Sequence, residues 1–194
     1  MTGPGLTAGE LLENGILVDR DIMVDMYRGF ERVIRFAGGL LYAAAKKAGA
    51  AMARRLAERG RVTRENALES IVYTFVAAGY AEEAVVESVE VREGETTVRL
   101  RVRGALLGSR LKSRKPVDQP IVGFIAGWLE ALLGCRVDGR EERCAAQGYE
   151  DCIFLFRVRC RAPELGAARG FRVTRSSALK ALTLGGRGLG LGAG

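Results

Sequence analysis

The chain contains no histidine. Every mechanism that depends on imidazole is therefore excluded, from Ser-His-Asp triads to HExxH zinc sites and histidine proton relays. The sequence also lacks a P-loop, a GxGxxG motif after a predicted strand and a nucleophile elbow. We therefore expect that the protein is not an enzyme.

Long hydrophobic runs are missing as well. The longest apolar stretch, around residues 36–45, ends at Lys46 and Lys47 and is far shorter than the ~20 residues that a membrane-spanning helix needs. The first residues contain Gly, Pro and Glu in place of the basic start and apolar run of a secretory signal. We expect a cytoplasmic protein without a transmembrane segment. Its 194 residues, 48% hydrophobic and 27% charged, are typical of one globular domain.

Acidic residues are scarce in the C-terminal part. Residues 157–194 contain eight basic residues and one acid, and 8 − 1 accounts for the whole net charge of +7. Apart from Phe171, this part lacks the aromatic residues on which bases stack. A basic, Gly-rich tail beside a neutral domain predicts no specific nucleic-acid binding; we expect a solvated tail, or one that docks on a partner, from residue 163 onward. We expect the domain to fold and to form a dimer without this tail, so that a chain truncated at residue 162 remains a folded dimer.

The remaining chain alternates between two hydrophobic periods. Apolar spacing of three and four predicts helices at 21–36, 39–59, 63–79 and 121–133, with Thr63 as the N-cap of the third and Pro120 in the first turn of the fourth. Alternation predicts two hairpins, at 85–102 and 135–160, and a short strand at Ile16–Val18. We predict an α+β fold, an antiparallel sheet of about four strands (two hairpins) with helices packed on one face, over residues 21–162 after a flexible segment 1–20.

The four cysteines lie within 26 residues, at Cys135, Cys144, Cys152 and Cys160. They are too few for a disulfide scaffold, and in a reducing cytosol such a cluster favours a metal site or plain core over bridges. Glu141 and Cys144 lie three apart, and Cys152 follows a Gly turn, so an antiparallel hairpin can bring a carboxylate and two thiolates together as zinc ligands. Buried apolar cysteines, or a disulfide between Cys144 and Cys152, remain alternatives.

Two segments together resemble a known family. The pattern ExxCxxxGxxxCxF at 141–154 follows the segment PVDQPIVGFIAGW, which carries Gly123 and Gly127. This combination resembles the 4-vinyl reductase domain family, found in archaeal stand-alone proteins and in bacterial aromatic-sensing transcription activators. The wider fold is similar to the subunits of the TRAPP vesicle-tethering complex that enclose an acyl chain. The resemblance covers about residues 20–160.

The resemblance implies a dimer-forming α+β domain that holds a small apolar molecule between sheet and helices, beside a structural zinc. In the phenol-sensing members the zinc ligands are a Glu, a Cys three residues on, a second Cys eight residues later and a further Cys upstream. Glu141, Cys144 and Cys152 match the first three positions. Asp118 stands where the family has the upstream Cys, and Cys135 is an alternative fourth ligand. The family name does not imply reductase activity, and phenol recognition through histidine does not carry over.

The glycine-containing helix also suggests a ligand pocket. Phe124 and Trp128 share one helix face, and Val72 and Phe75 can form the opposite wall of an apolar cavity of roughly 300 Å³ or more. Alternatively these are ordinary core residues, and the protein is a structural or adaptor subunit with a self-filled core. Homodimer contacts are expected where alanine and glycine at 37–53 allow close approach.

Overall fold

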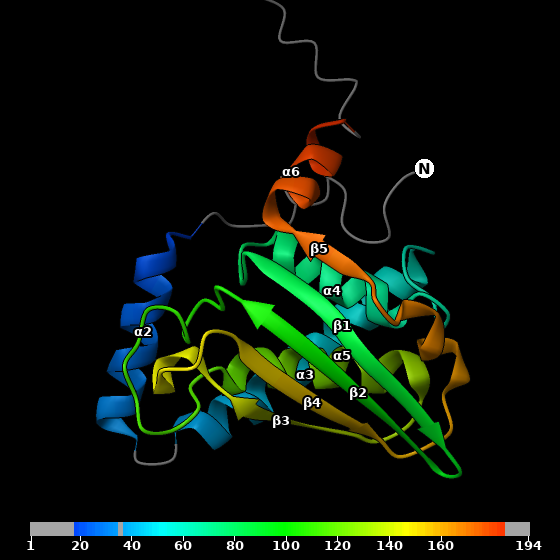
Figure 1. Cartoon of the computed structure of the whole chain (residues 1–194), viewed down its shortest axis with the longest axis horizontal. Coiled ribbons are helices and arrows are strands. Elements are labelled where there is room, and N and C mark those ends of the chain that lie inside the picture. Colours follow the sequence, from blue (N-terminus) through cyan, green and yellow to red (C-terminus); the bar gives the residue numbers. More distant parts are fainter. Residues whose placement is uncertain (1–17, 35–36, 185–194) are drawn as a thin grey trace, which may run out of the picture.

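In the computed structural model, which describes residues 18–34 and 37–184, helices cover one face of an antiparallel sheet (Figure 1). The sheet has five strands in the order β3-β4-β2-β1-β5. The strands are β1 (Glu83–Arg92), β2 (Glu95–Arg103), β3 (Val137–Arg143), β4 (Cys152–Val158) and β5 (Arg172–Thr174). The helices are α2 (Arg20–Val33), α3 (Ala37–Glu58), α4 (Ala67–Ala77), α5 (Gln119–Leu133) and α6 (Arg175–Leu184), with short 3-10 turns η1 (Ala145–Gln147) and η2 (Pro163–Ala168). The predicted α+β class and one-sided layering are confirmed.

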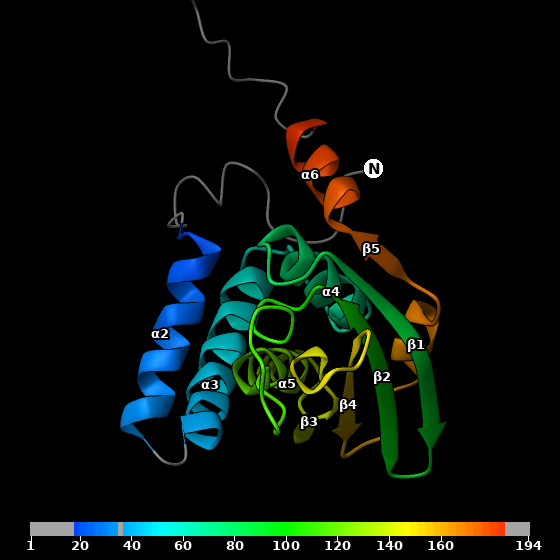
Figure 2. The same ribbon diagram turned by 60° about the vertical axis from the view of Figure 1, so that its left-hand side comes forward.

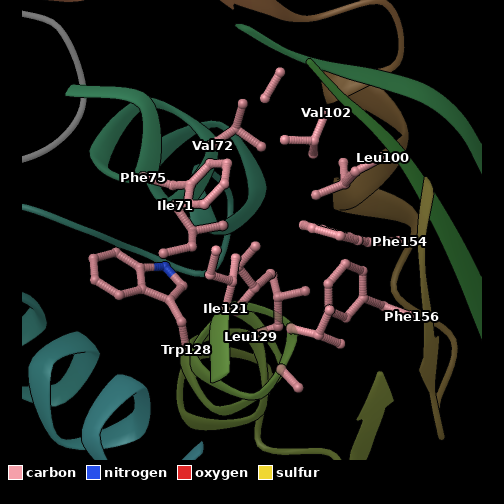
Figure 3. Packing of buried hydrophobic residues seen from close by; sticks show 14 of the residues in the cluster. Ile71, Val72, Phe75, Leu100, Val102, Ile121, Trp128, Leu129, Phe154 and Phe156 are labelled. Atoms are coloured by element: carbon pink, nitrogen blue, oxygen red, sulfur yellow. The ribbon is translucent and has the colours of Figure 1, made fainter. Parts of the chain in front are cut away.

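The two predicted hairpins form the centre of the sheet. On β2, Val98, Leu100 and Val102 are buried beneath the helices, while Arg99 and Arg101 on the other face form ion pairs with Glu87 and other acids of the neighbouring strands. β4 lies between β2 and β3, and its inward residues Phe154 and Phe156 complete the core (Figure 3). The alternation in the sequence therefore marks the buried face correctly.

Helices α3 and α5 approach each other through glycine. A Cβ on Gly49 would lie 2.0 Å from the carbonyl oxygen of Phe124, and a Cβ on Gly127 would lie 1.9 Å from that of Lys46. Any side chain at these two positions would clash with the facing backbone, so the helices can approach this closely only because both residues are glycine. The small residues at these positions thus serve packing within the chain, and only the outward residues of α3, including Ala43, Ala44 and Ala48, stay exposed.

Helix α4 begins three residues later than predicted, at Ala67. Asn66, not Thr63, precedes its first residue, and the Asn66 side-chain oxygen accepts a hydrogen bond from the Thr63 backbone N–H at 2.8 Å. The expected N-cap role of Thr63 is therefore wrong. The intervening residues form a turn instead of a first helical turn.

The segment after residue 162 joins the domain, contrary to the expectation of a tail. β5 pairs with β1, with Val173 opposite Ala84. Leu165 and Ala168 of η2 are buried, and Tyr73 of α4 donates a hydrogen bond to the Ala178 carbonyl oxygen of α6 at 3.3 Å. These apolar residues are few and widely spaced, which is why composition alone hid them. The Gly-rich end, 185–194, and most of the predicted strand at 16–18 lie outside the described residues.

Helix α2 stands beside α3 at one side of the molecule (Figure 2). Asp19 caps it by accepting a hydrogen bond from the Asp21 backbone N–H at 2.8 Å. Its inward residues Val24 and Tyr27 are buried. Within the described ranges no helix is both long and apolar enough to cross a membrane.

Candidate functional site

Four potential metal ligands meet at one end of the β3–β4 hairpin. Asp118 precedes α5, Glu141 lies on β3, Cys144 follows β3 and Cys152 begins β4. One ligand atom from each lies within 4.8 Å of the others, and all four side chains are buried. The structure therefore brings together the four residues that the sequence suggested as ligands.

A β-bulge places Cys144 on the same side of the sheet as Glu141. Glu141 pairs with Phe154, but Arg143 pairs with Ile153, so the register shifts by one residue between them. In a regular strand, residues three apart face opposite sides. The extra residue of a bulge reverses the alternation, and both the carboxylate and the thiol consequently point inward.

Asp118 is held by backbone donors from a buried turn. Its Oδ1 accepts hydrogen bonds from the N–H groups of Leu107 and Gly108, both at 3.3 Å. Its Oδ2 lies 3.5 Å from the sulfur of Cys152 and 3.9 Å from that of Cys144. These bonds fix one oxygen of the carboxylate and leave the other facing the two sulfurs.

The remaining ligand groups are oriented in similar ways. Glu141 accepts a hydrogen bond through Oε2 from the backbone N–H of Asp118 at 3.0 Å. Its other oxygen, Oε1, is buried without a hydrogen-bond partner among the described residues. The Ala145 backbone N–H donates to the sulfur of Cys152 at 3.2 Å, an arrangement that suits a thiolate.

The electrostatics of the cluster formed by Asp118, Glu141, Cys144 and Cys152 favour the binding of a cation. Burial, reinforced by the Glu141 carboxylate, raises the pKa of Asp118 to about 7. Burial and the neighbouring Cys144 thiol raise the pKa of Glu141 to about 8. The two thiols shift in opposite directions: the proximity of Cys152 lowers the pKa of Cys144, and the proximity of Cys144, together with burial, raises the pKa of Cys152. Four acidic groups around one point, with an unpaired inward oxygen, fit a divalent metal ion.

Cys135 and Cys160 take no part in this cluster, because they form a disulfide with each other. The suggestion of Cys135 as a fourth ligand is therefore wrong, as is the expectation that the cysteines avoid bridges. The register explains the pairing: Val137 lies opposite Val158 in the hairpin, so the residues two positions outward also face each other, with their Cα atoms 6.1 Å apart. Cys144 and Cys152 are free thiols.

An apolar cavity of about 340 Å³ lies among α2, α3, α4 and α5. Phe75 and Phe124, both suggested from the sequence, line it, together with Met23, Met52 and Ile121. Val72 and Trp128 do not line it. Both are fully buried in the core, with Val72 near Val102 and the Trp128 indole N–H donating to the Ala67 carbonyl oxygen at 3.1 Å (Figure 3).

A smaller hollow of about 140 Å³ adjoins the cavity, since the two share the lining residues Met23, Tyr80, Pro120 and Ile121. The other residues that line the hollow come from α2, from α3 and from the turn after β2: Met26, Tyr27, Phe30, Leu41, Leu106 and Leu107. Leu107 thus lines the hollow with its side chain while its backbone N–H donates to Asp118.

The turn at 105–108 is the part of the site that sequence reasoning missed. It lies between the predicted first hairpin and the helix at 121–133, where the sequence predicts no element, but Ala105, Leu106, Leu107 and Gly108 are all buried. A Cβ on Gly108 would lie 2.6 Å from Oδ2 of Asp118 and 2.8 Å from the sulfur of Cys152. The sequence does contain one sign of this burial, because four consecutive small or apolar residues stand here in a segment that is otherwise rich in basic residues.

A scan against protein-family models finds no match to this chain, and a search of curated proteins finds none either. Solved structures do match it. The phenol-responsive sensory domain of the transcription activator PoxR, with phenol, has a TM-score of 0.63 at 18% identity over 74% of this chain and 76% of that one. A vinyl-4-reductase family protein from Methanocaldococcus jannaschii has a TM-score of 0.51 at 15% identity over 77% and 87%. These two likenesses confirm the 4-vinyl reductase-like fold that the cysteine hairpin predicted.

A more distant likeness is to trafficking protein particle complex subunit 3 from Naegleria fowleri, covalently bound to palmitic acid, with a TM-score of 0.49 at 13% identity over 74% of this chain and 96% of that one.

Proposed function

We propose that the chain binds a small hydrophobic molecule in the cavity between α2, α3, α4 and α5, beside a structural zinc ion. The cavity of about 340 Å³ is the observation that carries this proposal. Its volume lies in the range of small-molecule sites, and its lining is almost entirely apolar. The likeness to a phenol-responsive sensory domain supports the same function. The protein acts by binding or sensing, without catalysis.

Zinc is the metal that the donor set favours. Thiolates from Cys144 and Cys152 select a borderline-soft ion, and carboxylates from Asp118 and Glu141 complete four ligands. Four protein ligands in a buried cluster leave no open position for a reacting water, which suits a structural role. When bound, the ion offsets part of the negative charge of the acidic groups and ties the second hairpin to the start of α5.

The second candidate is a structural or adaptor subunit with a self-filled core. Trp128 and Val72, which pack as ordinary core residues, are consistent with it. The cavity beside Phe75 and Phe124 favours ligand binding, because a self-filled core leaves few voids larger than a water molecule.

We also propose that the chain forms a homodimer through α2. Ile22, Met26, Phe30 and Val33 follow one another at helical spacing, with 44–85% of each side chain exposed, and Leu40 of α3 is 56% exposed. Soluble monomers seldom leave such an apolar stripe in water. A second copy offers the same stripe, and a twofold interface buries both together.

A titration with the fluorescent apolar probe N-phenyl-1-naphthylamine tests the binding function. The wild-type chain should bind the probe with saturable enhancement of its fluorescence. Ala45→Phe places an aromatic ring in the cavity and should abolish this binding, because Ala45 lines the cavity from α3. Ala57→Phe is the matched control, since Ala57 is exposed near the end of the same helix. Equal binding by both variants, or none by the wild type, would contradict the proposal.

A further inference from the structure

We propose that α2 pairs antiparallel with α2 of a second copy of the chain, and that this copy covers the hollow beside the cavity, so that ligand binding and dimerisation strengthen each other. This inference rests on the proposed ligand binding and names the regulation of that site. Figure 2 shows α2 at the edge of the molecule, with one side against α3 and the other facing outward.

The outward side of α2 carries a seam of the kind that joins paired helices. Its members follow one another at intervals of four, three and four residues: Ile22, Met26, Gly29 and Val33. Spacings that alternate between three and four place residues on the contact line of a coiled coil. The three apolar side chains of this seam are 53–85% exposed. Among the described residues, the seam is therefore left largely uncovered.

Gly29 lies at the centre of the seam and has no packing role within its own chain. A glycine inside a helix destabilises it relative to alanine. At Gly49, Gly123 and Gly127 the structure shows a reason, because an added Cβ would lie 1.9–2.3 Å from a carbonyl oxygen of the facing helix. At Gly29 none of the described residues lies within 4 Å of the added Cβ. A second helix that crosses α2 closely at Gly29 supplies the same reason there.

The charges beside the seam favour a second copy of α2 as the occupant. Asp25 and Arg32 lie seven residues apart, so they share one flank of the seam. In an antiparallel pair related by a twofold axis, this flank meets its own copy in reverse order, and each Asp25 faces Arg32 of the second copy. The Asp25 carboxylate also pairs with Arg28 of its own helix at 3.0 Å, through Oδ1, in an exposed contact of the kind that adds little stability.

The seam borders the hollow. Met26 belongs to the seam and Phe30 lies beside it, and both line the hollow although 53% and 44% of these side chains are exposed. A helix seated on the seam covers the exposed part of both side chains. An apolar ligand that reaches the hollow is then better shielded from water in the dimer than in the monomer. By linkage, such a ligand stabilises the dimer, and the dimer binds the ligand more tightly.

Sedimentation velocity, combined with N-phenyl-1-naphthylamine titrations of the full chain with its metal, tests this coupling. The wild type should dimerise, and the probe should shift the equilibrium toward the dimer. Gly29→Glu favours the helix but places a charged side chain in the seam, at a residue that lines neither the cavity nor the hollow. It should leave a monomer and weaken probe binding about tenfold, within the usual range of coupling between two sites. Gly166→Glu, the same change at another glycine with open space around it, should alter neither property.

Charge exchange tests the antiparallel arrangement. Asp25→Arg and Arg32→Asp should each weaken the homodimer, because like charges then face each other. An equimolar mixture of the two variants should give more heterodimer than random pairing, since both facing pairs become opposite in charge. Native mass spectrometry resolves the species by mass. Random pairing in the mixture would overturn the arrangement.

The outcomes separate this inference from the proposed function. If the wild type binds no probe at any protein concentration, the proposed function fails. If it binds the probe but stays monomeric, ligand binding stands and the second copy is overturned as the occupant; weaker probe binding by a monomeric Gly29→Glu would then place another segment of the chain on the seam. If Gly29→Glu still dimerises, the seam is overturned, and if it is monomeric but binds the probe as tightly as the wild type, the coupling is overturned.

Discussion

At the scale of single residues, Asp118 connects the candidate metal-binding cluster to the 105–108 turn, which lines the smaller hollow beside the cavity. One carboxylate oxygen receives the backbone N–H groups of Leu107 and Gly108, and the other faces the sulfurs of Cys144 and Cys152. The Asp118 side chain thus contacts both the 105–108 turn and the two thiols. At the position where the resemblance implies a cysteine, this chain has the Asp118 carboxylate, one oxygen of which is fixed by hydrogen bonds.

Replacing Asp118 tests its role as a ligand. Asp118→Ala should lower the zinc content well below one ion per chain and reduce the melting temperature, because three acidic groups remain around an incomplete shell. Asp118→Cys should retain zinc, since a softer thiolate then completes the site. Elemental analysis and thermal unfolding measure both effects. Full zinc content in Asp118→Ala would show that Asp118 is not a ligand.

Gly108 leaves room for the cluster without being part of it. A methyl group there would crowd Oδ2 of Asp118 and the sulfur of Cys152. Gly108→Ala should therefore weaken zinc binding by about tenfold, the lower end of the effects seen when ligand orientation is disturbed. Gly166→Ala is the control, because nothing lies within 4 Å of the added Cβ. Equal zinc affinity in a competition titration of the two variants would refute the steric argument.

At the scale of elements, the contact between α3 and α5 builds one wall of the cavity. Both helices contribute cavity residues, Ala45 and Met52 from α3 and Phe124 from α5. Gly127→Ala would press a methyl group against the Lys46 carbonyl oxygen and should lower the free energy of unfolding by about 3 kcal/mol. Gly39→Ala, on the open side of α3, should leave it unchanged or raise it slightly. Denaturant unfolding that ranks the two variants in the opposite order would contradict this packing.

The sequence predicts the main elements because their periodicities are strong. The spacing of apolar residues in α4 and α5 and the alternation in β2 reflect the burial that the structure shows. In α2 the spacing predicts the helix but not its buried face, because Ile22, Met26, Phe30 and Val33 are exposed while Val24 and Tyr27 are buried. The three-residue strand β5 leaves no periodic signal, and the bulge in β3 depends on a register that only pairing fixes. For the same reason the Cys135–Cys160 pairing was missed, although it follows once the hairpin register is known.

The candidate site was predictable only in part. Spacing and family resemblance identified all four members of the metal cluster. They identified Phe75 and Phe124 as cavity residues, but they could not separate them from Val72 and Trp128, because helical spacing does not tell core from cavity.

At the scale of the whole molecule, a disulfide and the candidate metal-binding cluster lie at opposite ends of the second hairpin. The disulfide joins Cys135 and Cys160, 25 residues apart, beyond the outer ends of β3 and β4. Replacing both by Ser should lower the free energy of unfolding by about 2–4 kcal/mol. Zinc content should be unchanged, because the cluster lies at the other end. Loss of zinc in this variant, measured alongside unfolding, would show that the two ends are not independent.

Native mass spectrometry of the purified chain with added 2-naphthol tests the central claim most directly. We expect, for each chain, the mass of the polypeptide with one zinc ion and one 2-naphthol, and gentle activation should release the naphthol while the zinc remains. In Ala45→Phe the zinc should persist and the naphthol adduct should disappear. A metal-free chain, or a naphthol adduct that the cavity-filling variant retains, would contradict the account.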